Sequence, residues 1–146
     1  MNTQIGHLTP KQARTRLVPW TNRAAPIAGD EYLHRLEHAR RLMHGLGVDA
    51  LLVSAGASLR YFAGVPWGAS ERLVALLLTA SGEPVLIAPV FEEGSLDAVL
   101  TIPVQKRLWE EHENPHALVA QVMADRGAST LALDPEAAFR IHTGLA

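Results

Sequence analysis

The sequence of 146 residues contains no cysteine. Disulfide bonds, zinc sites built on thiolates and a cysteine nucleophile are therefore excluded. Aromatic residues make up only 5% of the chain and charged residues 19%, whereas 48% of the residues are hydrophobic. This composition is typical of a globular domain rather than of a disordered segment, and the length suits one domain with a sizeable core.

Long apolar runs and a strong charge of either sign are also missing. The longest apolar run, residues 73–78, is far too short to span a bilayer, and residues 1–23 lack the apolar core of a signal peptide. A formal net charge of −2 argues against nucleic acid or an anionic membrane as a partner. The glycine patterns of nucleotide-binding loops are absent as well. The sequence therefore predicts a soluble, cytoplasmic protein that binds neither nucleic acid nor membrane.

The chain divides into an N-terminal arm, residues 1–29, and a domain, residues 30–146. Three prolines and no sustained hydrophobic period predict that the arm is extended, with a short helix over residues 10–18. Trp20 is expected to hold this arm against the domain. The last predicted helix starts at residues 134–135, and the sequence stops about three turns later. We therefore expect the chain to be a fragment of a longer protein.

The domain is predicted to begin with an amphipathic helix. Asp30 is placed to accept hydrogen bonds from the free N–H groups of its first turn, and Gly45 or Gly47 ends it. Its predicted buried face comprises Leu33, Leu36, Ala39, Met43 and Leu46. Helices are also expected over residues 58–64, 91–100 and 114–127, and strands over 49–53, 72–78, 84–88, 102–108 and 130–133. This alternation predicts a layered α/β domain, and a hairpin turn at residues 81–82 makes its sheet mixed.

The most specific catalytic pattern is His34-Arg35-Leu36-Glu37-His38, an H-x-x-E-H. In inverted zinc proteases the two histidines of this pattern bind zinc and the glutamate is the general base. At 100° per residue, however, His34 and His38 fall on the helix side opposite the apolar residues. A zinc site also needs a third ligand and a shaped cavity. We therefore interpret the pattern as a solvated helix face, with a small zinc protease as a rival hypothesis.

Two weaker patterns also have structural interpretations. The run Glu110-Glu111-His112-Glu113 with His116 offers metal-ligand side chains, but consecutive residues cannot all converge on one ion, and negative charge is favourable before a helix. The run Gly56-Ala57-Ser58-Leu59-Arg60 resembles a nucleophile elbow without its closing glycine. Ser58 is expected to cap the next helix instead. We therefore assign no catalytic residue and no metal ligand to the chain.

The loop over residues 65–72 is the best candidate for a binding site. It holds Trp67 and Arg72 among small residues. An arginine recognises a carboxylate at two points, and a tryptophan offers an apolar wall with one donor. The loop is therefore predicted to line a substrate pocket shared with another domain or subunit. The alternative is that Trp67 packs on its own domain and Arg72 is a charge at a strand edge.

From about Tyr32 onwards, the order of these motifs resembles the N-terminal domain of the creatinase, prolidase and aminopeptidase P family. Leu59-Arg60-Tyr61-Phe62-Ala63-Gly64 is similar to the family's N-[LI]-x-Y-[LFY]-[TS]-G segment, although Ser58 and Ala63 depart from it. The capped helix and strand before this segment fit the family's order. So do Glu71-Arg72 before an apolar hairpin, and Trp109 in an acidic linker before a proline-started helix and a last strand.

This resemblance implies a three-layer α/β/α domain with a mixed sheet of about five or six strands, related to the ribonuclease H-like motif. In the family, such a domain precedes a pita-bread catalytic domain, where two divalent metal ions (manganese, cobalt or zinc) activate the water that attacks the bond before proline. The N-terminal domain itself commonly builds a homodimer and narrows the partner subunit's active-site mouth. The implied partners are a C-terminal catalytic domain, a second copy of the chain and a proline-containing peptide.

The resemblance also implies a role for the loop. In creatinases an arginine a few residues past the Y-x-x-G segment holds the substrate carboxylate across the dimer, and Arg72 is the closest match to it by position. Trp67 is expected to lie beside the same site. The chain would then be the non-catalytic domain of an Xaa-Pro metallopeptidase. The alternative is a stand-alone α/β binding or interaction domain without peptidase activity.

Overall fold

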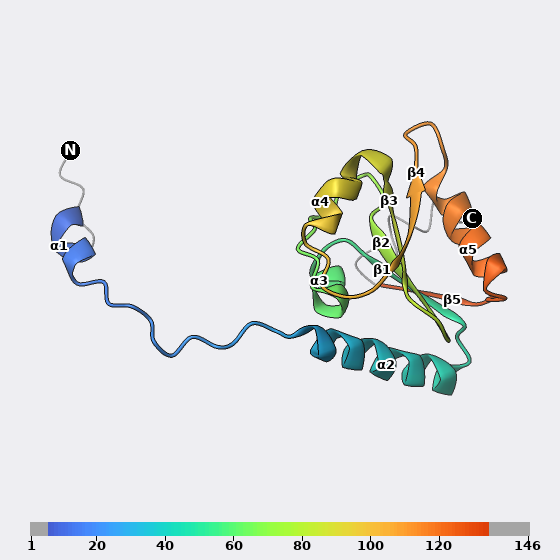
Figure 1. Cartoon of the computed structure of the whole chain (residues 1–146), viewed down its shortest axis with the longest axis horizontal. Helices are drawn as coiled ribbons and strands as arrows, with labels where there is room; N and C mark the ends of the chain where they lie inside the picture. Colours follow the sequence, from blue (N-terminus) through green and yellow to red (C-terminus); the bar gives the residue numbers. More distant parts are fainter. Residues whose placement is uncertain (1–5, 135–146) are drawn as a thin grey trace.

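A computed structural model describes residues 6–134 of the chain, of which residues 6–28 form an arm that leads away from the remainder (Figure 1). The arm carries one short helix, α1 (Pro10–Thr15), which begins where expected and ends earlier. Thr9 caps this helix, because its Oγ1 accepts a hydrogen bond of 3.3 Å from the N–H of Gln12.

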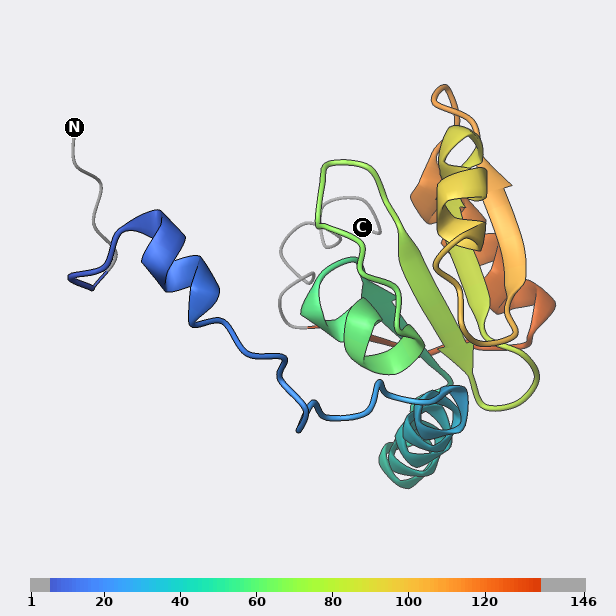
Figure 2. The same cartoon turned by 60° about the vertical axis from the view of Figure 1, so that its left-hand side comes forward.

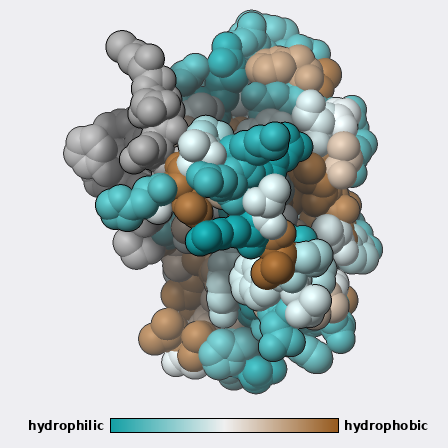
Figure 3. Space-filling view, turned by 90° about the vertical axis from the view of Figure 1, so that its left-hand side faces the viewer, coloured by the Kyte–Doolittle hydropathy of each residue, from teal (hydrophilic) through white to brown (hydrophobic). Residues whose placement is uncertain are grey.

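The arm makes no buried contact with the domain. Residues 6–28 are all exposed or half-buried. Trp20 is 73% exposed, so the prediction that it holds the arm in place is wrong. Figure 3, which views the molecule from the side of the arm, shows hydrophobic residues interspersed among hydrophilic ones. Tryptophan is apolar enough to be buried, but an arm without a sustained apolar period gives it no packed neighbours.

Five strands form one mixed sheet: β1 (Ala50–Ser54), β2 (Ala75–Thr79), β3 (Val85–Pro89), β4 (Gln105–Trp109) and β5 (Leu131–Leu133). Their spatial order is β4–β3–β2–β1–β5. The central strand β2 pairs antiparallel with β1 and β3, as the predicted hairpin requires. At the two edges, β5 is parallel to β1 and β4 is parallel to β3.

Helices cover both faces of the sheet. On one face lie α2 (Gly29–Leu46), α3 (Ala57–Ala63) and α4 (Glu93–Asp97), and on the other lies α5 (Pro115–Asp125) (Figures 1 and 2). Strand side chains alternate between the two resulting cores. Val53, Leu76, Leu78, Leu86 and Ala88 join the first core, whereas Ala50, Leu52, Ala75, Leu77, Val85 and Ile87 pack on the α5 side. This arrangement confirms the predicted three-layer α/β/α fold with a mixed sheet.

Helix α2 contacts the sheet through a narrower stripe than predicted. Leu36, Ala39 and Met43 are buried as expected, together with Tyr32. Leu33 is exposed because it lies 100° around the helix from Tyr32, and Leu46 is exposed because it lies in the last turn, beside the αL residue that ends the helix. The helix starts one residue before Asp30, whose Oδ1 accepts a 3.0 Å hydrogen bond from the N–H of Glu31.

Several other boundaries differ from the predicted ones. β2 starts at Ala75 rather than residue 72, because its partner β1 ends at Ser54, opposite Ala75. β4 starts at Gln105 rather than residue 102, because Pro103 has no N–H to donate to the ladder. The helix expected over residues 91–100 is split into a 3-10 turn, η1 (Val90–Glu92), and the short α4.

Two predicted caps have different outcomes. Asn114 caps α5 as expected, because its Oδ1 accepts a 2.9 Å hydrogen bond from the N–H of His116. Ser58 does not cap α3, because Gly56 occupies the N-cap position with φ 128° and the chain enters the helix before Ser58. The helix predicted from residues 134–135 lies outside the described residues.

Gly64 brings α2 and α3 into close contact. It ends α3 in the left-handed region with φ 72°. A side-chain carbon built on Gly64 would lie 2.9 Å from two ring carbons of Tyr32 and 2.9 Å from Oγ1 of Thr101. This explains physically why glycine follows the Tyr61 segment: the Tyr32 ring occupies the space that any larger residue would need.

Among the helices of residues 6–134, none combines the length and the hydropathy needed to cross a membrane.

Candidate functional site

The loop that sequence reasoning singled out as a binding site lies at one end of the sheet. The carboxyl end of β1, the amino end of β2 and the carboxyl ends of β3 and β4 meet there, because Ser54 pairs with Ala75 and Pro89 pairs with Trp109. The connection from α3 to β2, residues 64–74, runs over this end. The candidate site therefore lies on loops held by strand termini, a common position for binding residues.

Arg72 lies on this connection, and its guanidinium is bound by two glutamates. Nε and Nη2 donate to Oε1 of Glu111 at 3.2 and 3.0 Å, and Nη1 donates to Oε1 of Glu71 at 3.2 Å. The guanidinium carbon also lies 5.4 Å from the centre of the Phe91 ring, within cation–π range. The Arg72 side chain remains 42% exposed. It is thus an accessible cation held in one place by two carboxylates and one ring.

The backbone at Arg72 is fixed from both sides. The N–H of Arg72 donates to Oγ of Ser70 at 3.2 Å, and that hydroxyl donates to the carbonyl of Arg72. On the other side, Nε1 of Trp109 donates to the carbonyl of Leu73 at 3.1 Å. Trp109 is buried as the last residue of β4. The expectation that Trp109 belongs to an acidic linker is therefore wrong. The tryptophan fills the core and ties β4 to the segment that carries Arg72.

Trp67 lies on the same connection between α3 and β2 as Arg72. It is half-buried and packs against the core shared by α2, α3 and α4. Among the described residues, no hydrogen bond or ring contact joins it to Arg72. The sequence alternative that Trp67 packs on its own domain therefore describes its placement.

The acidic run before α5 does not converge on one point. Oε2 of Glu113 accepts a hydrogen bond of 2.7 Å from the N–H of Glu110, whereas Glu111 binds Arg72. His116 lies in the first turn of α5, where burial lowers its pKa. Within residues 6–134, no group of three or more histidine, aspartate or glutamate side chains is arranged to hold a metal ion.

The H-x-x-E-H residues lie where the helix period placed them. His34 and His38 are exposed on the outer side of α2, opposite the buried stripe. Glu37 forms an ion pair with Arg40, and Nδ1 of His38 lies 3.4 Å from Nη2 of Arg41. Each side chain points to solvent or to a neighbour on the same helix, so the three do not form a shared cavity.

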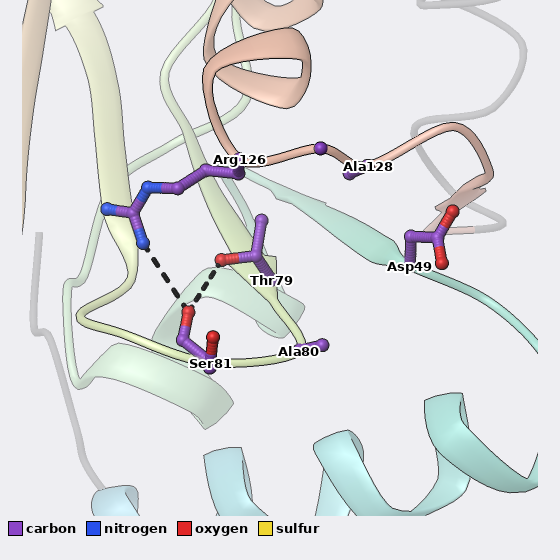
Figure 4. Close-up of a pocket in the computed structure, with 7 residues that line it drawn as sticks. Asp49, Thr79, Ala80, Ser81, Arg126 and Ala128 are labelled. Carbon is purple, nitrogen blue, oxygen red and sulfur yellow. Dashed lines mark hydrogen bonds between the residues drawn. The ribbon is translucent and has the colours of Figure 1, made fainter.

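A shallow pocket lies at the opposite end of the sheet (Figure 4). Its polar groups bind one another: Nη1 of Arg126 donates to the carbonyl of Ser81 at 3.4 Å, and Oγ1 of Thr79 donates to the same carbonyl at 3.0 Å. Nη2 of Arg126 donates to Gln105 at 2.8 Å. The lining residues are Asp49, Thr79, Ala80, Ser81, Arg126, Gly127 and Ala128. These contacts hold the β2–β3 turn against the end of α5, so they stabilise the fold.

Asp49, at the rim of this pocket, joins β1 to β5. Its Oδ2 accepts hydrogen bonds from the N–H and the hydroxyl of Ser129, both at 2.8 Å, and from the N–H of Thr130 at 2.9 Å. These donors stabilise the charged carboxylate, the N–H of Ser129 most of all, and lower the pKa of Asp49 from 3.8 to about 2.

Within residues 6–134, two buried polar atoms at the same end of the sheet as Arg72 have no hydrogen-bond partner. They are Oγ of Ser54, the last residue of β1, and Oε2 of Glu92, in the turn after β3. Buried polar atoms in folded proteins nearly always have a partner.

The chain is similar in sequence to proteins that are already known. Residues 35–146 match the model of the Creatinase/Prolidase N-terminal domain. A probable dipeptidase PepE from Mycobacterium tuberculosis is 29% identical over 105 residues, which cover 70% of this chain and 28% of the relative. The chain thus corresponds to little more than a quarter of that relative's length.

Solved structures show the same fold. The dipeptidase PepE from Mycobacterium ulcerans superposes with a TM-score of 0.68 and 28% identity, over 83% of this chain and 34% of the other. The Creatinase/Prolidase N-terminal domain of an X-Pro dipeptidase from Streptococcus pyogenes superposes with a TM-score of 0.64 and 21% identity, over 77% and 85% of the two chains. The second structure is an N-terminal domain by itself, and this chain covers most of it.

Proposed function

Because the chain belongs to the Creatinase/Prolidase N-terminal domain family, we propose that it is the non-catalytic N-terminal domain of an Xaa-Pro metallopeptidase. In this proposal the domain shapes the substrate site and the dimer, and a C-terminal domain performs the hydrolysis. The relatives described above are dipeptidases, which supports a dipeptidase or prolidase activity for the whole protein. A cytoplasmic location is part of the same proposal.

The observation that carries the proposal is Arg72. It presents a fixed, partly exposed guanidinium on a loop at the end of the sheet, and this end also holds two buried polar atoms that have no hydrogen-bond partner within residues 6–134. A guanidinium recognises a carboxylate through two parallel hydrogen bonds. We propose that Arg72 binds the free carboxylate of a proline-containing dipeptide, across the dimer. Trp67 supports this site from beneath by packing the loop on the core.

In the same proposal, the metal chemistry belongs to the catalytic domain. The family implies two divalent ions, manganese, cobalt or zinc, and such ions require several converging carboxylates and imidazoles. The described residues offer no such group, because the acidic run before α5 binds Arg72 and its own backbone. No step of the reaction is therefore assigned to these residues.

The first test compares substrates with and without a free carboxylate in the full-length protein. For Arg72→Ala we expect KM for an Xaa-Pro dipeptide to rise about tenfold, equivalent to ~1.4 kcal/mol, which is at the low end for a charge-assisted hydrogen bond. KM for the corresponding dipeptide amide should change little. Arg107→Ala is the matched control, because Arg107 is a similarly exposed arginine whose ion pair with Asp125 lies away from the loop. Equal effects of Arg72→Ala on both substrates would contradict the assignment.

The second test concerns the isolated chain. Residues 1–146 should hydrolyse no Xaa-Pro dipeptide, with or without added manganese. Turnover that depends on metal and survives purification of this chain alone would refute a non-catalytic role.

A further inference from the structure

Arg72 binds a carboxylate of its own chain. Glu111 places one oxygen, Oε1, between Nε and Nη2 of Arg72 at 3.2 and 3.0 Å. This is one of the two guanidinium edges that can bind a carboxylate at two points. An edge that could receive a peptide carboxylate is therefore occupied by a carboxylate of the same chain.

The approach of Glu111 is set by the fold. Glu111 lies in the turn between β4 and α5, two residues after Trp109. Trp109 in turn donates its hydrogen bond to Leu73, the neighbour of Arg72. A second hydrogen bond, from the N–H of Glu110 to Glu113, closes the turn. These contacts bring Arg72 and Glu111, which are 39 positions apart in the sequence, into hydrogen-bonding distance.

The ion pair between Arg72 and Glu111 is weak enough for another carboxylate to replace Glu111. The Arg72 and Glu111 side chains are 42% and 63% exposed, and Glu111 lies outside any helix or strand. Ion pairs of such exposure contribute little to stability and are screened by salt. A carboxylate that enters with additional contacts elsewhere on its peptide can therefore displace Glu111 without unfolding the loop.

We propose that Glu111 is an internal competitor for Arg72, which occupies the guanidinium until a substrate carboxylate displaces it. This inference rests on the proposed carboxylate-binding role of Arg72. While Glu111 is bound, it keeps the guanidinium beside the Phe91 ring. Glu111 would also make binding selective, because only a peptide with a free carboxylate directly after proline could replace it on this edge. Longer peptides and amides would then gain no binding energy from Arg72.

Glu71 provides a matched control for Glu111. It contacts the same guanidinium through Nη1 at 3.2 Å, and it is 80% exposed. Replacing either glutamate by glutamine removes one negative charge near Arg72. Only Glu111→Gln also weakens the contact on the Nε–Nη2 edge. The difference between the two variants therefore separates competition for the edge from a general change in charge.

The test measures steady-state kinetics of the full-length protein with an Xaa-Pro dipeptide and its amide. For Glu111→Gln we expect KM for the dipeptide to fall about two- to fivefold, the range that exposed ion pairs support. Glu71→Gln should lower KM less. KM for the amide should stay the same in both variants, which also verifies that the protein is folded. The fall in KM for the dipeptide caused by Glu111→Gln should become smaller at high salt and disappear when Arg72 is also replaced by alanine.

The outcomes distinguish the two levels of the proposal. If Arg72→Ala raises KM for the dipeptide but Glu111→Gln leaves it unchanged or raises it, Glu111 only positions Arg72 and the competition is refuted, while the proposed function stands. If Arg72→Ala has no effect on either substrate, the carboxylate-binding role fails and the competition fails with it. An equal fall in KM for Glu71→Gln and Glu111→Gln would mean that the change in KM comes from the loss of one negative charge near Arg72. That result would also overturn the inference.

Discussion

Replacing Gly64 by alanine should destabilise the domain for two separate reasons. Gly64 has φ 72°, and alanine pays about 1–2 kcal/mol for the left-handed region. The new methyl carbon would also lie 2.9 Å from ring carbons of Tyr32, well inside contact distance. The Tyr32 ring is buried in the core between α2 and the sheet, so it has little room to withdraw. Overpacking of this kind costs about 1–3 kcal/mol.

The expected loss of stability for Gly64→Ala is therefore about 2–5 kcal/mol, which is a large share of the free energy of unfolding of a small domain. Gly47→Ala is the matched control. Gly47 ends α2 with φ 67°, nearly the same backbone conformation, and nothing lies within 4 Å of the added carbon. This control should lose only about 1–2 kcal/mol, the cost of the left-handed region alone.

Urea unfolding of both variants, followed by far-UV circular dichroism, measures the two free energies. The slopes should match that of the unaltered chain, so that a shift in midpoint reports a change in stability. Equal losses for Gly64→Ala and Gly47→Ala would refute the close approach of α2 and α3, because only the backbone cost is common to the two sites.

Two further predictions concern Asp49 and the arm. Because hydrogen bonds from Ser129 and Thr130 lower the pKa of Asp49 to about 2, its carboxylate contributes stability that is complete above about pH 4 and is lost as pH falls towards 2. Asp49→Asn should therefore lower the urea midpoint at pH 7, and the difference from the unaltered chain should shrink between pH 4 and 2; a constant difference would contradict the assignment. Removal of residues 1–28 should leave the midpoint of urea unfolding within experimental error, since none of residues 6–28 is buried; a clear loss of stability would mean that the arm packs on the domain.

The sequence predicts the layers of this domain well because its strands and helices obey simple periods. Strand 85–89 is apolar throughout and strand 75–79 is apolar except for Thr79, and both are buried along their whole length, as expected for strands covered on both faces. Leu36, Ala39 and Met43 likewise follow from the helical period. Boundaries are less predictable, because they depend on partners: β2 begins where β1 ends, and no local signal marks that position.

The sequence predicts some residues of the candidate site but not the contacts between them. Arg72 stands out as a charge among small residues, but its contact with Glu111 joins positions 39 apart and leaves no local pattern. Trp109 illustrates the same limit, since its burial depends on β3 and α5 beside it rather than on the acidic residues that follow. Trp67 was predicted to form a pocket wall, and the structure packs it against the first core. Sequence alone does not separate these placements, because tryptophan suits a binding loop and a core equally well.

The parallel pairing of β5 with β1 has a consequence for synthesis of the chain. Asp49 leaves the ribosome 80 residues before its partner Ser129. Until then β1 has β2 on one side only, and its other edge presents unpaired backbone beside apolar side chains. Open apolar edges recruit strands from other chains. A nascent or truncated chain that ends before β5 is therefore the form most prone to aggregate, and completion of the sheet by its last strand closes that edge.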